Sequence, residues 1–327
     1  MTFKTTVIDA GGRYGLHPTW KSFSGELAYY LFEPDLSECE RLLSKYANRA
    51  DEINILNLAL DKGDGLLEID VFKNRAMSSS AVRNPISSLF KDERLREVHI
   101  IDRIKVQSRS IDSFSVENML EVDFLKLDTE GSEYDILLGA RNQISKNVIG
   151  VRVEVSFDHI FEGKPLFGAI SEFLLNENFF LLNLDYNGRG DYQNEFVNLD
   201  GRYGILTASD AVFLRRKDSF FEMDESGGIS QATRILKYAA FCFENGASDV
   251  GLDFLLCGRR DHDANFDLIN ETSLFRFVDR SVHKLFYTLK WQPGQSLQRH
   301  AECYKHIFGK EMKMINEYME SIELNPD

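Results

Sequence analysis

Short apolar runs alternate with helix-like segments through the first two thirds of the chain. The runs are Thr5–Asp9, Ala28–Glu33, Ile53–Ala59, Val122–Asp128, Val148–Glu154, Phe179–Leu184 and Ala211–Arg215. Several are apolar almost throughout, which is typical of strands buried on both faces of a sheet. Strands that alternate with helices of about 10–15 residues predict βαβ units and a mainly parallel sheet.

The segment after the fourth run has the pattern of a crossover helix. Ser132 is placed to cap its N-terminus, and the charge of Glu133 suits the positive end of a helix dipole. An apolar stripe follows at Ile136, Leu137, Ala140 and Ile144. This spacing predicts a helix that packs on one face of the sheet.

An insertion precedes the fourth run. Leu66–Phe72 and Ile104–Gln107 predict a hairpin or extra strands, and a polar loop with three serines, Ser78–Ser80, lies between them. We interpret Ser79 as a substrate contact in a loop that closes over the cofactor or the substrate. A plain surface loop is the alternative.

The pattern changes after Lys217, where strand-like runs end and helical periodicity begins. The helical segments are Ile229–Glu244, Val250–Cys257, Phe266–Lys290 and Leu297–Ile322. We therefore predict two domains, 1–217 and 218–327, with Asp224–Gly228 as the linker. The helical domain is expected to serve as a lid, a surface for homo-oligomerisation or a docking module.

Carboxylates end four of the predicted strands: Asp9, Glu33, Asp128 and Glu154. The carboxyl ends of parallel strands share one edge of the sheet, and ligands bind in the crevice outside it. Carboxylates that converge there are costly unless they meet hydrogen-bond donors or a cation. The sequence therefore predicts the functional site at this edge.

The loop after the first strand reads Asp9-Ala-Gly-Gly-Arg-Tyr-Gly15. Its glycines allow a tight turn and close approach of a ligand to the backbone. The dinucleotide fingerprint G-x-G-x-x-G fails because residue 13 is arginine, which argues against an NAD-dependent oxidoreductase. Glu33 ends the second strand and is placed to bind both hydroxyls of a ribose. A glycine-rich turn followed by a surface glutamate is the structural alternative.

Three motifs together resemble the FkbM family of S-adenosylmethionine-dependent methyltransferases. They are the D-x-G-x-x-x-G of the first loop, Phe32–Asp35, and Lys126–Ala140 (KLDTEGSEYDILLGA), and Val153–Phe161 (VEVSFDHIF) also fits. The resemblance covers residues 5–216. It implies a class I methyltransferase fold, an α/β Rossmann-like domain with a mostly parallel seven-stranded sheet and helices on both faces. A C-terminal all-α domain follows it here.

The resemblance also implies a cofactor site for S-adenosylmethionine. Asp9, Gly11 and Gly15 would cradle its methionine part, in the loop that includes Gly12 and Arg13. Glu33 would bind the ribose, and the stretch Ala59, Leu60 and Asp61 would border the adenine. Arg13 would pair with the cofactor's carboxylate or stay solvated in the turn.

Family membership usually means O-methylation of a sugar or polyketide hydroxyl. The hydroxyl must lose its proton, so a base in hydrogen-bond reach is expected to contribute about 10²–10⁴-fold. The candidates are Asp128, which we rank first, and Glu130, Glu154 and His159. A buried partner, Lys126, would lower the pKa of Asp128 and weaken it as a base.

The acceptor is expected to be a small molecule or a glycan. The loop Asp185–Asn194 offers Tyr186 and Tyr192, whose aromatic faces suit sugar rings, although ordinary hairpin aromatics have the same pattern. Asp128, Glu130, Glu154 and His159 lack a diagnostic ligand spacing, so no metal is predicted. A methyltransferase-like scaffold without activity, with the helical tail as its interaction module, is the remaining alternative.

Composition narrows the partners. The 38 Lys and Arg against 52 Asp and Glu give a net charge of −14, which argues against electrostatically driven binding of nucleic acid or anionic membrane. No run reaches the ~18–20 apolar residues of a membrane span, and no signal peptide precedes the first strand. The four cysteines form no ligand pattern. We expect a cytoplasmic protein.

Overall fold

The computed structural model describes residues 3–84, 87, 99–190, 205–223, 230–289 and 297–312. Contacts divide the chain into two compact units. The sheet unit comprises Lys4–His17 and Leu27–Asp224, and the helical unit comprises Met1–Phe3, Pro18–Glu26 and Glu225–Asp327. The break after Asp224 lies seven residues beyond the predicted boundary at 217, and the helical unit includes a short segment from near the N-terminus.

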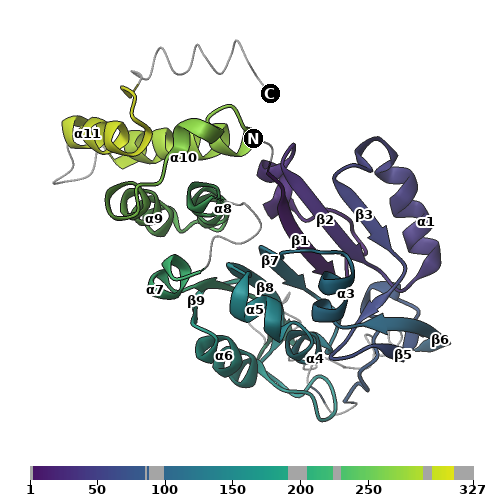
Figure 1. The fold of residues 1–327 in the computed structure, drawn as a ribbon. Helices are drawn as coiled ribbons and strands as arrows, with labels where there is room; N and C mark the ends of the chain where they lie inside the picture. Colours follow the sequence, from purple (N-terminus) through teal and green to yellow (C-terminus); the bar gives the residue numbers. More distant parts are fainter. Residues whose placement is uncertain are drawn as a thin grey trace. The chain divides into compact units, whose positions relative to one another are not determined.

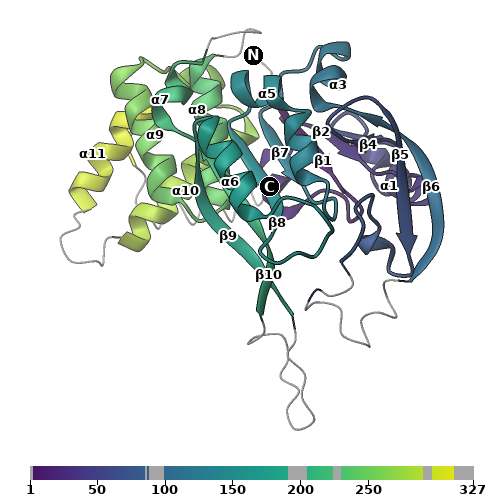
Figure 2. The ribbon, with the colours of Figure 1, turned by 90° about the horizontal axis from the view of Figure 1, so that it is seen from below.

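A seven-stranded sheet organises the sheet unit (Figure 1). Its strands are β1 (Thr5–Ala10), β2 (Leu27–Phe32), β3 (Ile53–Leu56), β7 (Phe124–Leu127), β8 (Gly150–Ser156), β9 (Phe179–Gly190) and β10 (Ile205–Arg215). They lie in the order β3-β2-β1-β7-β8-β10-β9, and β10 runs antiparallel to the other six strands. Each predicted apolar run is one of these strands, so the mostly parallel sheet is confirmed. Figure 2 shows β9 and β10 as a long pair.

Helices cover one face of this sheet with a continuous apolar core. They are α3 (Ile111–Glu117), α4 (Glu133–Leu138), α5 (Arg141–Lys146) and α6 (Phe167–Asn176). Alternate strand residues such as Ile8, Leu125 and Val153 point into this core and are fully buried. Their neighbours Asp9, Lys126 and Arg152 therefore point to the opposite face. That face also receives α1 (Leu36–Lys45), which packs against β3, and α7 (Lys217–Phe221) follows β10.

The predicted insertion is a separate three-stranded sheet. It contains β4 (Ala59–Leu60), β5 (Gly65–Phe72) and β6 (Ile100–Arg109), with β6 in the centre. β5 and β6 pair antiparallel, from Gly65 opposite Ser108 to Phe72 opposite Ile100. A 3-10 turn, η3 (Arg75–Met77), leads from β5 into the serine loop.

The crossover helix differs from the prediction at its start and in its middle. Ser132 is the residue before α4, but its side chain makes no capping bond and instead hydrogen-bonds Ser80, Oγ to Oγ at 2.7 Å. Glu133 accepts the backbone N–H groups of Thr129 and Gly131 in its place. The helix breaks at Gly139, where a Cβ would lie 2.4 Å from the carbonyl oxygen of Asp61.

The helical unit consists of α8 (Gln231–Glu244), α9 (Ser248–Asp261), α10 (Ser273–Leu289) and α11 (Leu297–Phe308), with the short 3-10 helices η1 (Pro18–Phe23) and η4 (Phe266–Ile269). α8 packs against α9 and α10, with Tyr238 stacked on Phe254. Trp20 of η1 is fully buried and stacks on Phe241 of α8. In the part of the chain that is described, no helix combines the length and apolarity needed to cross a membrane.

Trp20 ties the segment near the N-terminus to the C-terminal helices. We expect Trp20→Ala to lower the free energy of unfolding by about 3–5 kcal/mol, because it empties a fully buried aromatic site. Urea unfolding measures this. Tyr14→Ala, at a side chain that is 77% exposed, is the control and should change stability by less than about 0.5 kcal/mol. Equal effects of the two substitutions would contradict the assignment of Trp20 to the core.

Candidate functional site

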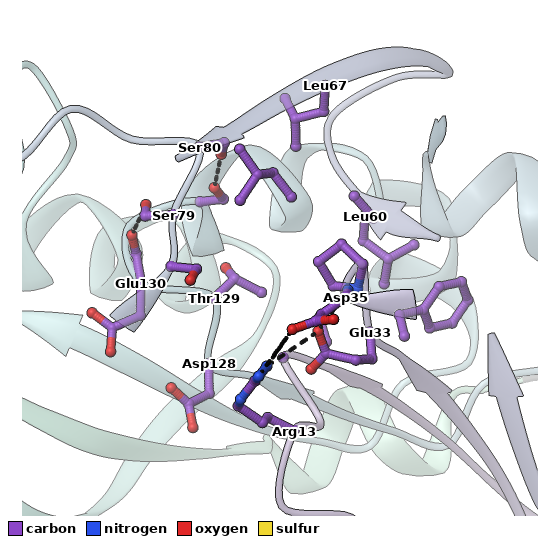
Figure 3. Close-up of a pocket in the computed structure, with 18 of the residues that line it drawn as sticks. Arg13, Glu33, Asp35, Leu60, Leu67, Ser79, Ser80, Asp128, Thr129 and Glu130 are labelled. Carbon is purple, nitrogen blue, oxygen red and sulfur yellow. Dashed lines mark hydrogen bonds and ion pairs between the residues drawn. The ribbon is translucent and has the colours of Figure 1, made fainter. Parts of the chain in front are cut away.

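A cavity opens at the carboxyl ends of β1, β2 and β7 (Figure 3). Its lining includes Ala10, Gly11, Arg13, Phe32, Glu33, Asp35, Leu58, Ala59, Leu60, Leu67, Ile69, Val71, Arg75, Ser79, Ser80, Ile104, Asp128, Thr129, Glu130 and Ser132. The cavity lies between the main sheet edge and the three-stranded insertion, so elements far apart in the sequence build it together.

Glu33 lies at the end of β2 with its carboxylate on the cavity wall. The residue is only 5% exposed, and Oε1 accepts the backbone N–H of Asp35 at 2.9 Å. Burial raises the pKa of Glu33 to about 7, although the Asp35 amide and Arg13 oppose the shift. Hydroxyl donors of a bound ligand would stabilise the ionised form of this carboxylate.

Position 11, where β1 and β7 end side by side, requires a glycine. Its φ is +80°, and a Cβ built on it would lie 1.7 Å from the carbonyl oxygen of Asp128. The other two glycines of the loop, Gly12 and Gly15, are not among the described residues that line the cavity. A Cβ on Gly12 would meet Leu31, and one on Gly15 would meet the ring of Tyr46. In the structure both glycines shape the loop by packing against protein, and their expected roles as ligand contacts stay predictions.

An apolar wall faces Glu33 across the cavity. Leu67, Ile69 and Val71 alternate along β5 and project into it, together with Ile104 of β6. Ala59 and Leu60 line the cavity as expected, whereas Asp61 does not and its backbone N–H pairs with Arg109. Sequence analysis missed the β5 residues, although the apolar alternation in Leu66–Phe72 was a usable signal.

Asp9 lies beneath the cavity and does not line it. Its carboxylate is fully buried, accepts the hydroxyl of Tyr29 and lies 3.2 Å from Nζ of Lys126. Burial raises the pKa of Asp9, and the charge of Lys126 opposes that shift. In the structure Asp9 holds a supporting position under the loop, and its direct contact with the cofactor stays a prediction.

Lys126 also contacts Asp128, at 3.3 Å from Nζ to Oδ2. Burial alone would lower the pKa of Lys126, but the charges of Asp9 and Asp128 outweigh it and raise the pKa. The ammonium therefore links a buried carboxylate to one on the cavity wall. The expected pairing of Lys126 with Asp128 is present.

Arg13 points across the cavity to the end of β2 (Figure 3). Its guanidinium binds Oδ2 of Asp35 at 3.0 and 3.2 Å and lies 4.0 Å from Glu33. Arg75, from the turn after β5, binds the same Asp35 oxygen at 2.8 Å. Arg13 was expected to pair with the cofactor's carboxylate or to stay solvated in the turn. In the structure it instead binds Asp35, which joins the first loop to the insertion.

Glu130 has a left-handed backbone, with φ of 60°, that non-glycine residues rarely adopt. Ser79 donates its hydroxyl to the Glu130 carbonyl, and Arg83 binds Oε2 of Glu130 at 3.1 Å. Burial raises the pKa of Glu130 to about 7, against the opposing charge of Arg83. Ser79 thus contacts the turn that carries Glu130. Strain of this kind is frequent at functional sites.

Glu154 lines a second, smaller hollow on the other side of the β7–α4 turn. Glu133 and Asp158 line the same hollow. Burial raises the pKa of Glu154 well above its usual value, and the nearby charge of Glu130 adds to the shift. Burial and the acidic neighbours thus disfavour the ionised form of Glu154, which counts against it as the base.

The remaining candidates lie outside both hollows or outside the described side chains. His159 is exposed, and its backbone carbonyl accepts Asn84. Tyr192 lies outside the described residues, as does the side chain of Tyr186. Among the residues that the structure describes, no three His, Cys, Asp or Glu side chains are grouped to hold a metal ion.

Comparison with known families identifies the chain. The family model described as the Methyltransferase FkbM domain matches residues 9–181, more than half of the sequence. The protein therefore belongs to the FkbM methyltransferase family. It is a methyltransferase whose cofactor is S-adenosylmethionine. No curated protein matches it.

Three solved structures align at low similarity. A proposed RNA methyltransferase from Pyrococcus horikoshii has 11% identity and a TM-score of 0.32, over 65% of this chain and 76% of its own. A proposed tRNA (m1A22) methyltransferase from Streptococcus pneumoniae has 9% identity and a TM-score of 0.31, over 94% and 91%. TrmK of M. capricolum, with S-adenosylhomocysteine, has 10% identity and a TM-score of 0.32, over 85% and 89%.

The cavity fits this cofactor chemically. The apolar wall of β5 and β6 suits a flat heterocycle, and the carboxylate of Glu33 suits a ribose diol. Asp128 and Glu130 offer negative charge to a sulfonium on the other side of the cavity. We therefore assign Glu33, Ala59, Leu60 and Gly11 to cofactor binding as a proposal that the following variants test.

The raised pKa of Glu33 predicts pH-dependent binding of adenosine. Only the ionised carboxylate accepts two ribose hydroxyls, so affinity should rise about tenfold from pH 6 to pH 8 as Glu33 ionises near pH 7. Glu33→Gln should bind more weakly and lose this dependence. Isothermal titration measures both, with Glu172→Gln on the exposed surface of α6 as the matched control. An identical pH dependence in Glu33→Gln would exclude Glu33 as the ribose ligand.

Gly11→Ala should destabilise the sheet unit by about 3 kcal/mol or more, because the new methyl group overlaps backbone of the neighbouring strand. Gly168→Ala is the matched control. Gly168 lies in α6 with open space around its Cβ position, so alanine there should stabilise by about 0.5–1 kcal/mol. Urea unfolding compares the two, and equal stabilities would refute the close approach at Gly11.

Proposed function

We propose that the protein transfers the methyl group of S-adenosylmethionine to a hydroxyl of a sugar or glycan. The observation that carries this proposal is Glu130, a half-buried residue of the cavity lining that Arg83 binds at 3.1 Å and whose pKa is raised to about 7 by burial. Alcohols are poor nucleophiles until they lose a proton, and a base with a pKa near the working pH removes it best. Acceptors that carry a free amine do not need such a base. The acceptor class follows from the family resemblance.

Two carboxylates compete for the role of base. Asp128 is the first-ranked candidate from sequence, but Lys126 binds it at 3.3 Å and occupies part of its accepting capacity. Arg83 binds Oε2 of Glu130 at 3.1 Å, and burial raises the pKa of Glu130. We therefore assign the base to Glu130. Asp128 supplies a fixed negative charge beside the reacting group.

The steps follow from these positions. When bound, S-adenosylmethionine supplies an electrophilic methyl group on a positively charged sulfur. The acceptor oxygen forms the new bond to that carbon, and the sulfur–carbon bond breaks with its electron pair retained by sulfur. A carboxylate oxygen of Glu130 takes the hydroxyl proton. Arg83 holds Glu130 in place, and Ser79 fixes the strained turn that presents it.

A screen for transfer of a tritiated methyl group to sugars and lipid-linked glycans tests the activity. Incorporation into a hydroxyl, located by mass spectrometry, supports the proposal. Isothermal titration with S-adenosylmethionine and with NAD separates the enzyme from the competing interpretations. A protein that fails to bind S-adenosylmethionine at millimolar concentration would instead be a scaffold with a methyltransferase-like fold.

Glu130→Gln should lower kcat by about 10²–10⁴-fold, because the amide cannot take the proton, while affinity for S-adenosylmethionine stays within a few-fold. At saturating S-adenosylmethionine, which removes the effect of Glu33 on binding, kcat of the wild type should rise with pH through a pKa of about 7, and this rise should vanish in the variant. Asp128→Asn is the comparator, and exposed Glu172→Gln is the control. If Asp128→Asn abolished the pH-dependent rise and Glu130→Gln retained it, Asp128 would be the base.

A further inference from the structure

A second group of charged side chains lies on the sheet face opposite the helix-packed core. It consists of His17, Arg152, Asp185 and Asp210, which we call the polar cluster. Both terminal nitrogens of Arg152 bind Oδ2 of Asp185 at 2.9 Å, and its Nε lies 3.4 Å from Oδ2 of Asp210. His17 comes from the loop after β1, and the others come from β8, β9 and β10. No role in cofactor binding accounts for them.

Asp128 connects the polar cluster to the cofactor cavity. It lines the cavity, and its charge also acts on His17 and on Asp210. Lys126, its ion-pair partner, is registered with Arg152 across the parallel pair of β7 and β8. The polar cluster therefore begins at the wall of the cavity. It lies on the side of Asp128 that is away from the apolar wall of β5 and β6. A second substrate that meets the methyl group beside Asp128 would rest on it.

The carboxylates of this region are more exposed to solvent than the cations that bind them. The side chains of Asp128, Asp185 and Asp210 are 42%, 32% and 26% exposed, whereas those of Lys126 and Arg152 are 11% and 9% exposed. The buried cations bind these partly exposed carboxylates, and Oδ1 of Asp185 also accepts the side-chain amide of Asn183 at 2.6 Å. Such a surface accepts hydrogen bonds from hydroxyl or ammonium groups of a ligand.

The formal charges in this region also determine which ligand charges are favoured. Asp9, Asp128, Asp185 and Asp210 carry four formal negative charges, against two formal positive charges on Lys126 and Arg152. Burial raises the pKa of Asp9 and of Asp210, and the neighbouring cations oppose both shifts. His17 adds no positive charge at neutral pH, because burial and the charge of Arg152 lower its pKa to about 4. A phosphate or carboxylate on the ligand would meet net repulsion here.

We propose that the polar cluster is the acceptor subsite, and that it takes a neutral or amino-substituted polyhydroxylated substrate and rejects phosphorylated or carboxylated ones. This inference rests on the proposed O-methyl transfer and specifies its substrate class. The carboxylates of Asp185 and Asp210 accept hydroxyl or ammonium groups of the acceptor, and Arg152 fixes their orientation. These residues position the acceptor and take no part in proton transfer.

The test uses matched pairs of sugars with the full-length protein: glucose against glucose 6-phosphate, and glucosamine against glucuronic acid. Tritiated methyl transfer gives kcat and KM for each. We expect the neutral or amino member to have at least a tenfold higher kcat/KM. Asp185→Asn and Asp210→Asn should each raise the acceptor KM about tenfold, leave the dissociation constant of S-adenosylmethionine unchanged, and narrow the preference over the charged partner.

Glu172→Gln, which removes one carboxylate from an exposed position on α6, should change none of these values. Faster methylation of the phosphorylated or carboxylated sugars would overturn the inference and leave O-methyl transfer standing. Unchanged acceptor KM and selectivity in both Asp185→Asn and Asp210→Asn would overturn it as well. If S-adenosylmethionine binds but none of the sugars is methylated, the proposed function fails and the subsite falls with it.

Discussion

The contact of Lys126 with two carboxylates is the interaction on which the site depends. Its ammonium lies 3.2 Å from Asp9 and 3.3 Å from Asp128, so one buried cation joins the ends of β1 and β7. Removing one partner of a buried ion pair generally costs about 3–5 kcal/mol, because the other charge is left uncompensated. The two strand ends are thereby held together, and the close approach at Gly11 becomes a fixed feature of the loop.

The turn that follows β7 builds on this junction. Asp128 ends the strand, Glu130 takes the left-handed conformation, and Gly131 continues it with φ of 107°. Glu133 then binds the free N–H groups of the turn and begins α4. The turn separates two hollows, so its carboxylates face different environments although they lie within a few residues of each other. This local geometry explains why so many acidic residues are tolerated in a short stretch.

Periodicity was enough to predict the architecture, because buried strands such as β1 and β7 are apolar along their whole length. The carboxyl-edge rule also placed Glu33 and Asp128 at one cavity. The sequence pattern could not reveal that Asp9 is buried beneath this cavity. The depth of a side chain depends on partners from other strands, here Tyr29 and Lys126. The pattern likewise missed Asp35, whose role arises only when Arg13 and Arg75 converge on it. Long-range pairing of charges leaves no periodic signal in a sequence.

The four carboxylates that end adjacent strands illustrate how environment divides one residue type among several tasks. Asp9 is fully buried and paired, and it serves the structure. Glu33 is buried beside an apolar wall and suits a diol. Asp128 stays partly exposed between the cavity and Lys126, while burial and acidic neighbours raise the pKa of Glu154. Equivalent positions in a parallel sheet therefore acquire different chemistry from the distance to the nearest cation and from the depth of burial, which is the general means by which protein sites separate acids from bases.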